Sequence, residues 1–208
     1  MGMTILPTEA LSPNLRRSIA AYDEHPGYFE QRFAAVDTAD LREKFVDTLP
    51  PGRNLIIDAG CGTGRDLRGF ATLGVTALGI DLSSQLLAVA DGAAPLIRAD
   101  FRSMPLADAS IAGVWSMASL VHLTKHESLQ ALREFARVVG AHCPVFISVM
   151  AGATGQWLDG GGGPRWFTGM TPNDIQVLAE AAGLELASIA PSQGSIGGRW
   201  LNASLRKR

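Results

Sequence analysis

The sequence contains few cysteines and no long run of one charge. Its two cysteines, Cys61 and Cys143, are too few for a disulfide framework and lack the spacing of a metal cluster, so we expect no metal. Lysine and arginine number 18 against 20 aspartates and glutamates, which gives a net charge of −2. Because enzymes of nucleic acids need a basic surface for phosphate contacts, a nucleic-acid partner is not expected. The balance favours a small or weakly charged partner molecule.

Long hydrophobic segments are also absent from the sequence. No apolar run approaches the ~20 residues that span a bilayer, and residues 1–10 lack a basic region followed by an apolar one, as a secretory signal requires. We therefore expect a cytoplasmic protein without membrane contact. The 208 residues, 47% apolar and 18% charged, fit a single globular domain over 1–208, either monomeric or homodimeric.

The chain falls into two parts by pattern. Residues 1–36 carry scattered aromatic residues and predict irregular structure with one or two short helices, which we interpret as an N-terminal lid segment. After residue 38, strand and helix patterns alternate. Predicted strands cover 55–57, 75–80, 95–98, 111–116, 144–149, 184–190 and 199–206, and predicted helices cover 39–49, 64–73, 83–91, 124–139 and 171–183. This alternation predicts an α/β fold with a doubly wound, mostly parallel sheet and helices on both faces. Residues 151–169 are predicted as a loop, and the glycine patch Gly160–Gly163 within it is predicted to be mobile from its composition.

A glycine-rich turn follows the first predicted strand, with the sequence Gly60-Cys61-Gly62-Thr63-Gly64. Ligands of open α/β sheets bind beyond the carboxyl ends of the strands, and glycine lets the backbone approach them closely. The dinucleotide fingerprint G-x-G-x-x-G would require a further glycine at position 65, where this chain has Arg65. Asp58, at the end of the strand, suits a positively charged ligand better than a pyrophosphate. A dinucleotide binder of the dehydrogenase kind is therefore disfavoured.

Acidic residues also end the next two predicted strands. Asp81 follows the second strand and can accept hydrogen bonds from both hydroxyls of a ribose. Asp100 and Phe101 follow the third strand, where a carboxylate can receive an adenine amino group and a ring can cover the base. Together with Asp58 and the glycines, this set matches an adenosyl ligand without phosphates.

These motifs carry a resemblance to a known family. Leu55–Leu67, Gly79–Ser83 and Ala99–Phe101 resemble the class I S-adenosylmethionine-dependent methyltransferases, in particular the small bacterial ones that act on diverse small substrates. The segment Gly113–Leu123 is similar to the family's fourth strand and the loop after it. The resemblance implies a Rossmann-like sheet of seven strands, whose last strand, near 200–207, lies antiparallel between the fifth and the sixth.

The resemblance also implies S-adenosyl-L-methionine as cofactor and a set of residues around it. Glycine-turn residues and Asp58 would line the methionine moiety, Arg65 would pair with its carboxylate, and Met117 would offer backbone groups near its amine. The full expected set is Tyr22, Asp58, Gly60, Cys61, Gly62, Gly64, Arg65, Asp81, Leu82, Asp100, Phe101 and Met117. For Arg65, pairing with Asp66 is the alternative, and Cys61 is expected to fill space rather than act as a nucleophile.

Three further residues are candidates for catalysis or substrate binding. His122, in the loop after the fourth strand, is the candidate general base, the alternative being a histidine that packs or caps this loop. Arg165 and Trp166 flank the glycine patch and are candidate substrate contacts, the alternative being core packing. Tyr22 would form part of a lid over the cofactor, the alternative being plain hydrophobic cover for the sheet.

The function expected from these features is transfer of a methyl group to an oxygen, nitrogen or carbon nucleophile of a small molecule by in-line displacement. Two alternatives remain open at this stage. One is an RNA methyltransferase, against which the lack of a basic stripe argues. The other is a protein that binds the adenosyl cofactor on the same fold without catalysis.

Overall fold

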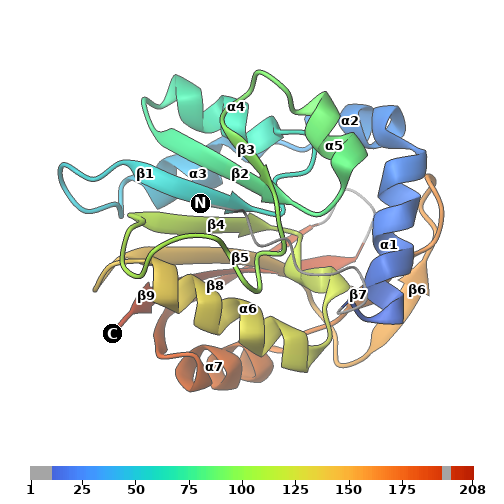
Figure 1. Cartoon of the computed structure of the whole chain (residues 1–208). Coiled ribbons are helices and arrows are strands. Elements are labelled where there is room, and N and C mark those ends of the chain that lie inside the picture. Colours follow the sequence, from blue (N-terminus) through green and yellow to red (C-terminus); the bar gives the residue numbers. More distant parts are fainter. Residues whose placement is uncertain (1–10, 194–197) are drawn as a thin grey trace.

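A seven-stranded mixed sheet forms the centre of the computed structural model, which describes residues 11–193 and 198–208 (Figure 1). Its strand order is β3-β2-β1-β4-β5-β9-β8, and only β9 runs antiparallel to its neighbours in that described part of the chain. The strands are β1 Leu55–Ala59, β2 Thr76–Asp81, β3 Leu96–Arg98, β4 Gly113–Met117, β5 Pro144–Met150, β8 Leu184–Gln193 and β9 Arg199–Lys207. The predicted α/β class and the antiparallel strand between the fifth and sixth are therefore confirmed.

Helices pack on both faces of the sheet. They are α3 Ala39–Val46, α4 Arg65–Thr72, α5 Ser84–Val89, α6 Lys125–Val138 and α7 Pro172–Ala181. Because successive strand side chains point to opposite faces, Ile56 packs in a cluster with α3 and α4 residues, whereas Ile57 packs in the cluster that includes α6 and α7. The strands β1, β4 and β5 are thus buried on both sides, as their continuous apolar runs predict.

The sequence also specifies where the helices begin. The side chains of Thr124 and Thr171 each accept a hydrogen bond from the backbone N–H of the third helical residue. The acidic side chain of that residue accepts one in turn from the backbone N–H of the threonine, which completes a capping box for α6 and for α7. Helix α4 instead begins after Gly64, whose φ of +77° favours glycine. The predicted ends were less accurate: α5 stops at Val89 rather than 91, and β8 continues to Gln193 rather than 190.

Two segments stand at one end of the sheet. Helices α1 Pro13–Glu24 and α2 Pro26–Ala34 form one, and a hairpin of β6 Gly155–Leu158 and β7 Arg165–Thr168 forms the other (Figure 1). The prediction of a loop over 151–169 was wrong, because strands of four residues are too short to show a clear period. The segments touch: Tyr28 Oη donates to the Gly160 carbonyl at 2.5 Å.

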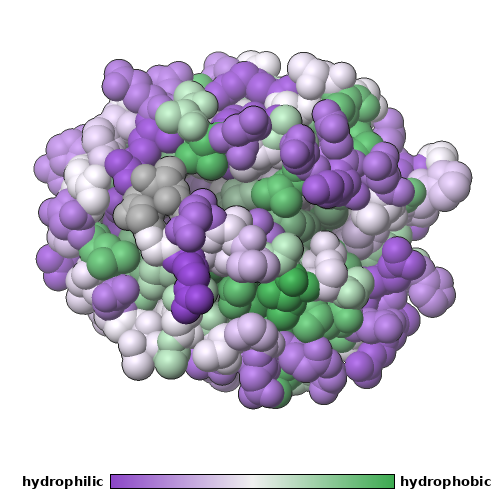
Figure 2. Space-filling view, turned by 180° about the vertical axis from the view of Figure 1, so that it is seen from behind, coloured by the Kyte–Doolittle hydropathy of each residue, from purple (hydrophilic) through white to green (hydrophobic). Residues whose placement is uncertain are grey.

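The surface of the molecule is mixed in character. Figure 2 shows hydrophilic residues over most of one face, interrupted by smaller hydrophobic patches. The large apolar side chains that are exposed in the described residues are Tyr28, Leu55, Trp157 and Val177, which lie on different elements. Within 11–193 and 198–208, no helix has both the length and the apolar character that crossing a membrane requires.

Candidate cofactor and acceptor site

A cavity of about 280 Å³ lies beyond the carboxyl ends of β1, β2 and β4. Strand β1 lies between β2 and β4, so the order of the strands reverses beside it. Open α/β sheets bind ligands at such a point, beyond the carboxyl ends of the strands. Helices α1 and α2 and strand β7 complete the wall. Among the residues expected at the site, those lining the cavity are Tyr22, Asp58, Gly60, Cys61, Gly62, Arg65, Asp81, Leu82, Asp100, Phe101, Met117, His122 and Arg165.

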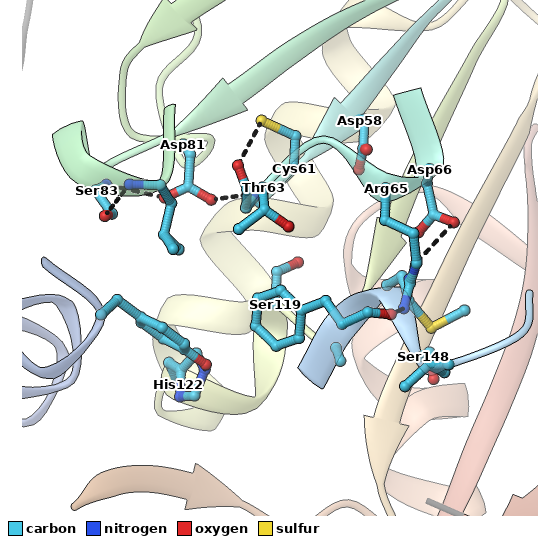
Figure 3. A pocket seen from close by; sticks show the side chains of 18 of the residues that line it. Asp58, Cys61, Thr63, Arg65, Asp66, Asp81, Ser83, Ser119, His122 and Ser148 are labelled. Atoms are coloured by element: carbon cyan, nitrogen blue, oxygen red, sulfur yellow. Dashed lines mark hydrogen bonds and ion pairs between the residues drawn. The ribbon is translucent and has the colours of Figure 1, made fainter. Parts of the chain in front are cut away.

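The glycine turn between β1 and α4 forms one wall of this cavity (Figure 3). Gly60 has a φ of +80°, and a Cβ added to it would lie 2.3 Å from the Cβ of Ser119. Gly62 has a φ of +54°. Gly64, which we expected at the cofactor, does not line the cavity; a Cβ there would lie 3.1 Å from Ala90 and Ala93. Gly64 therefore serves close packing and the start of α4.

Asp58 places a carboxylate at the floor of the cavity. Its residue is 2% exposed, and its side chain makes no hydrogen bond to any residue of the described ranges. Burial raises the pKa of this carboxyl well above its usual value, and the neighbouring carboxylates of Asp66 and Asp81 raise it further against the opposing charge of Arg65. A ligand carrying a positive charge would relieve this cost.

Asp66 is a carboxylate of the opposite kind, because four side chains donate to it. Thr38 Oγ1 donates at 2.6 Å, Arg42 at 2.7 Å and the Trp115 indole at 3.1 Å. Arg65 forms an ion pair with it at 2.5 Å. Burial alone would raise the pKa of Asp66, but the pairing with Arg65 and the other donors lowers it. Arg65 thus takes the alternative contact foreseen for it, while its contact with the cofactor stays a prediction.

Asp81 and Asp100 end β2 and follow β3, as expected. The backbone N–H groups of Gly62 and Ser83 donate to Asp81, each at 2.9 Å, yet burial still raises the pKa of this carboxyl. Asp100 is held by the guanidinium of Arg102, with distances of 2.6 to 3.0 Å to its two oxygens. Figure 3 shows Asp81 on one side of the turn and Asp58 on the other. A ligand of extended shape could contact both.

His122 lies across the cavity in a short 3-10 turn after β4, Leu120–His122. Its Nδ1 is 2.6 Å from the Trp166 carbonyl oxygen, which can only accept, so Nδ1 carries the proton. Its Nε2 is 2.9 Å from Tyr22 Oη and therefore accepts from it. Burial, and to a lesser extent the positive charge of Arg165, lower the pKa of His122 to about 4 against the opposing effect of the hydrogen bond with the Trp166 carbonyl, so the ring is neutral at pH 7.

Arg165 and Trp166, the two expected substrate contacts, lie on opposite sides of β7. Arg165 is 2% exposed and lines the cavity beside Tyr22. Trp166 does not line it: its indole packs on Trp157 and donates to Thr168. This position gives no support to a substrate contact by the Trp166 side chain, whose backbone carbonyl instead orients His122.

Other lining residues were not foreseen from the sequence. Ser119, after β4, donates to the Ala59 carbonyl and so ties the β4 loop to the glycine turn. Phe33 of α2 reaches the same turn, 3.4 Å from where a Cβ of Gly62 would lie. Ser148 and Asn202 come from β5 and β9. Only Phe33 offered a signal, as one of the aromatic residues of the N-terminal segment; the others depend on which strands become neighbours.

Comparisons with known proteins find methyltransferases. Residues 56–141 match the family model described as a methyltransferase domain. An O-methyltransferase of Pyrenophora dematioidea is 31% identical over 144 residues, which is 61% of this chain and 52% of the relative. This chain thus spans about half the length of that relative.

Solved structures with low identity share the fold. The 1,6-didemethyltoxoflavin-N1-methyltransferase of Burkholderia thailandensis, with bound 1,6-didemethyltoxoflavin and S-adenosylhomocysteine, superposes with a TM-score of 0.71 at 16% identity over 99% of this chain and 94% of its own. The magnesium protoporphyrin IX methyltransferase of Synechocystis PCC 6803, with bound S-adenosylmethionine, gives 0.72 at 16% identity over 97% and 100%. At such identities the likeness concerns the fold.

Proposed function

We propose that the chain is an S-adenosylmethionine-dependent methyltransferase and that it transfers a methyl group to a small molecule held in the cavity. The match of residues 56–141 to a methyltransferase-domain model and the shared class I fold support this proposal. The observation that carries this proposal is the buried carboxylate of Asp58, without a hydrogen-bond partner in the described residues, next to a glycine turn with bare backbone. A phosphate-free ligand with a positive charge fits these two features, whereas a pyrophosphate does not.

We propose that different residues of the cavity contact different parts of the cofactor. Asp58 would accept hydrogen bonds from the ammonium group, and Gly60 and Gly62 leave room for the ligand beside their backbone. Asp81, already fixed by two backbone N–H groups, would accept from the ribose hydroxyls. Phe101 would cover the adenine, and Asp100 would share its oxygens between Arg102 and the adenine amino group. S-adenosylmethionine, when bound, supplies a methyl group on a sulfonium that is already a good leaving group.

The chain's own task is then to position the acceptor and exclude water. The lid of α1, α2 and the β6–β7 hairpin brings apolar side chains to the cavity, among them Leu15, Ile19 and Phe33. A cavity with such walls favours a small acceptor over a polymer. The methyltransferase of Burkholderia thailandensis that shares this fold likewise contains a bound small molecule, 1,6-didemethyltoxoflavin. We propose no role for nucleic acid.

His122 and Tyr22 form the route by which a protonated acceptor would lose its proton. Tyr22 Oη lines the cavity and donates to His122 Nε2, so a proton taken from the acceptor passes through the tyrosine hydroxyl to the imidazole. Because Nε2 is engaged by Tyr22, His122 itself acts on the acceptor only through this hydroxyl.

Replacing Tyr22 by Phe should lower turnover with a protonated acceptor and leave the affinity for S-adenosylhomocysteine nearly unchanged.

Carboxylate substitutions test the cofactor site. We expect Asp81→Asn and Asp58→Asn each to weaken S-adenosylhomocysteine binding about tenfold or more, since each removes hydrogen bonds to a charged acceptor. Isothermal titration calorimetry measures this affinity. Asp91→Asn is the matched control, because Asp91 is exposed and does not line the cavity. Unchanged affinity in both variants, or tighter binding of NAD than of S-adenosylhomocysteine by the unmodified protein, would refute the assignment.

A second measurement separates catalysis from binding alone. The protein is incubated with methyl-labelled S-adenosylmethionine and a small-molecule extract, and label transferred to the extract is counted. Transfer above that of the Asp81→Asn variant is the expected result. A protein that binds the cofactor but transfers no label would contradict the catalytic proposal.

A further inference from the structure

Arg165 is a buried cation that has no anion close to it in the part of the chain that the structure describes. Its residue is 2% exposed, and no carboxylate of the described residues lies within 4.0 Å of its guanidinium. Among the described residues, the guanidinium donates only to Tyr22 Oη and the Gly161 carbonyl, both at 3.4 Å, the outer limit of a hydrogen bond. Its Nε has no partner at all within the described ranges. The strongest donor group of this wall is therefore largely unused.

Aromatic rings surround this cation. Its Cζ lies 4.6 Å from the ring centroid of Phe29, 5.3 Å from that of Tyr22 and 5.7 Å from that of Phe167. Ring faces attract a cation, but they offset only part of the several kcal/mol that burying a charge costs. By contrast, Arg42, Arg65 and Arg102, which are half-buried, each pair with a carboxylate. Among the described residues Arg165 is the only arginine that is buried, and it has no such pair.

The position of Arg165 separates it from the cofactor's expected place. It belongs to the wall formed by α1, the turn after β4 and β7, together with Tyr22 and His122. The methionine end of the cofactor is expected at Asp58 and the glycine turn, between β1 and α4. The positive charges that shift the pKa of Asp58 there are those of Arg65 and Arg42. Arg32, half-buried, also lines the cavity and has no carboxylate partner among the described residues, so it adds to the positive potential of this end.

We propose that the methyl acceptor is a small, largely apolar molecule that carries a carboxylate, and that this carboxylate pairs with Arg165. This inference rests on the proposed methyltransferase function and specifies its substrate class. A carboxylate matches the planar donor fork of arginine and can take two hydrogen bonds from it, including one from the unused Nε. The neighbouring side chains Leu15, Ile19 and Phe167 suit an apolar or aromatic body. The carboxylate is the anchor of the acceptor, next to the Tyr22–His122 pair.

Three pairs of probes test the preference: benzoate with benzamide, 4-hydroxybenzoate with 4-hydroxybenzamide, and cinnamate with cinnamamide. Each pair differs in charge and hardly in shape. Binding is measured by calorimetry at pH 7.5 with saturating S-adenosylhomocysteine. We expect the acid of at least one pair to bind about tenfold more tightly than its amide, as an added charged hydrogen bond implies. Acids that bind no better than their amides, or not at all up to about 20 mM, overturn the proposal.

Substitution of Arg165 tests the residue itself. Arg165→Gln should bring the acid down to the affinity of its amide while leaving S-adenosylhomocysteine binding within about twofold. Arg165→Lys should recover part of the acid preference. Arg17→Gln, which removes an exposed arginine that stacks on Trp157 outside the cavity, should change neither affinity.

The outcomes distinguish the two proposals. If the unmodified protein does not bind S-adenosylhomocysteine, the proposed function fails. If it binds and Arg165→Gln keeps the acid preference, the acceptor inference alone fails. If Arg165→Gln weakens S-adenosylhomocysteine binding about tenfold instead, Arg165 holds the cofactor and the inference is likewise overturned. Should Arg165→Gln fail to fold, the comparison of acid and amide on the unmodified protein still decides the matter.

Discussion

At the scale of single residues, the site is governed by which charges have partners. Asp66 and Asp58 lie close enough to shift each other's pKa, yet Asp66 is held by donors and stays ionised, while Asp58 is buried without one. Arg165, like Asp58, is a buried charged residue without a charged partner in the described residues, but its charge is positive. Unpaired buried charges cost stability, so natural proteins keep them mainly where a ligand completes the pairing. Both ends of the cavity carry such a residue.

His122 allows a prediction about pH. Its pKa is about 4 in the folded protein against 6.5 ordinarily, because burial favours the neutral ring. A lowered pKa of a histidine stabilises the fold fully above pH 6.5, and this contribution is lost as the pH falls toward 4. We expect it to amount to roughly 3 kcal/mol at most. Urea denaturation between pH 4 and 7.5 should therefore give a shallower pH dependence for His122→Asn than for the unmodified protein.

His126→Asn is the control for this measurement. His126 is exposed on α6, and among the described residues its ring hydrogen-bonds only to the Gln130 side chain. Its substitution should therefore leave the pH dependence of the free energy of unfolding unchanged. Parallel curves for His122→Asn and the unmodified protein would mean that His122 is not buried as a neutral ring.

At the scale of secondary-structure elements, the β1–α4 turn and the segment after β4 fit each other at one point. Gly60 passes so close to Ser119 that no side chain can be added, and the Ser119 hydroxyl donates to the Ala59 carbonyl just before the turn. A further short hydrogen bond joins Ser119 and Ser116 at 2.5 Å. The floor of the cavity therefore depends on two elements that are about sixty residues apart in the chain.

Gly60→Ala should disrupt this fit. The new Cβ would require a shift of Ser119 and would hold alanine at a φ of +80°, so we expect a loss of about 2–4 kcal/mol in the free energy of unfolding and loss of S-adenosylhomocysteine binding. Gly74→Ala is the matched control: its φ is +71°, but nothing lies within 4 Å of the added Cβ. It should cost about 1 kcal/mol and leave binding intact. Equal effects of the two substitutions in denaturation and calorimetry would show that the Ser119 contact is unimportant.

At the scale of the whole molecule, the N-terminal helices and the β6–β7 hairpin close the cavity together. Ser18 of α1 accepts from the Trp166 N–H at 3.0 Å, and Tyr28 of α2 donates to the Gly160 carbonyl. Phe29 lies where a side chain at Gly162 would clash, at 2.6 Å, so the glycine patch is required by packing. We interpret α1, α2 and the hairpin as one lid that belongs to the same domain as the sheet.

This interpretation predicts a distributed response to the cofactor product. Because Tyr22 and Phe33 line the same cavity as the glycine turn, S-adenosylhomocysteine should slow amide hydrogen exchange in α1, α2 and the hairpin as well as at residues 58–66. Helix α7, which contributes no residue to the cavity, is the internal control. Mass spectrometry of exchanged peptides measures this, and protection restricted to residues 58–66 would contradict the lid.

The sequence alone determined the class of fold and most of the strand-end residues that line the proposed cofactor end of the cavity. The reason is that strand and helix periods, glycines and strand-end acids are local features, and parallel strands bring their carboxyl ends to one edge wherever they lie. Asp58, Asp81 and Phe101 could therefore be placed from their positions in the chain.

Only the tertiary structure decided what surrounds the proposed acceptor end. The β6–β7 hairpin has strands of four residues, too short to show a clear period. The hydrogen bonds of Tyr22 with His122 and with Arg165 join residues about 100 to 140 positions apart in the chain. Whether a buried arginine has a partner depends on every element packed around it, and no local pattern encodes that. The same holds for Arg65 and Asp66, adjacent in sequence, whose ion pair became decisive only with Thr38, Arg42 and Trp115 assembled around it.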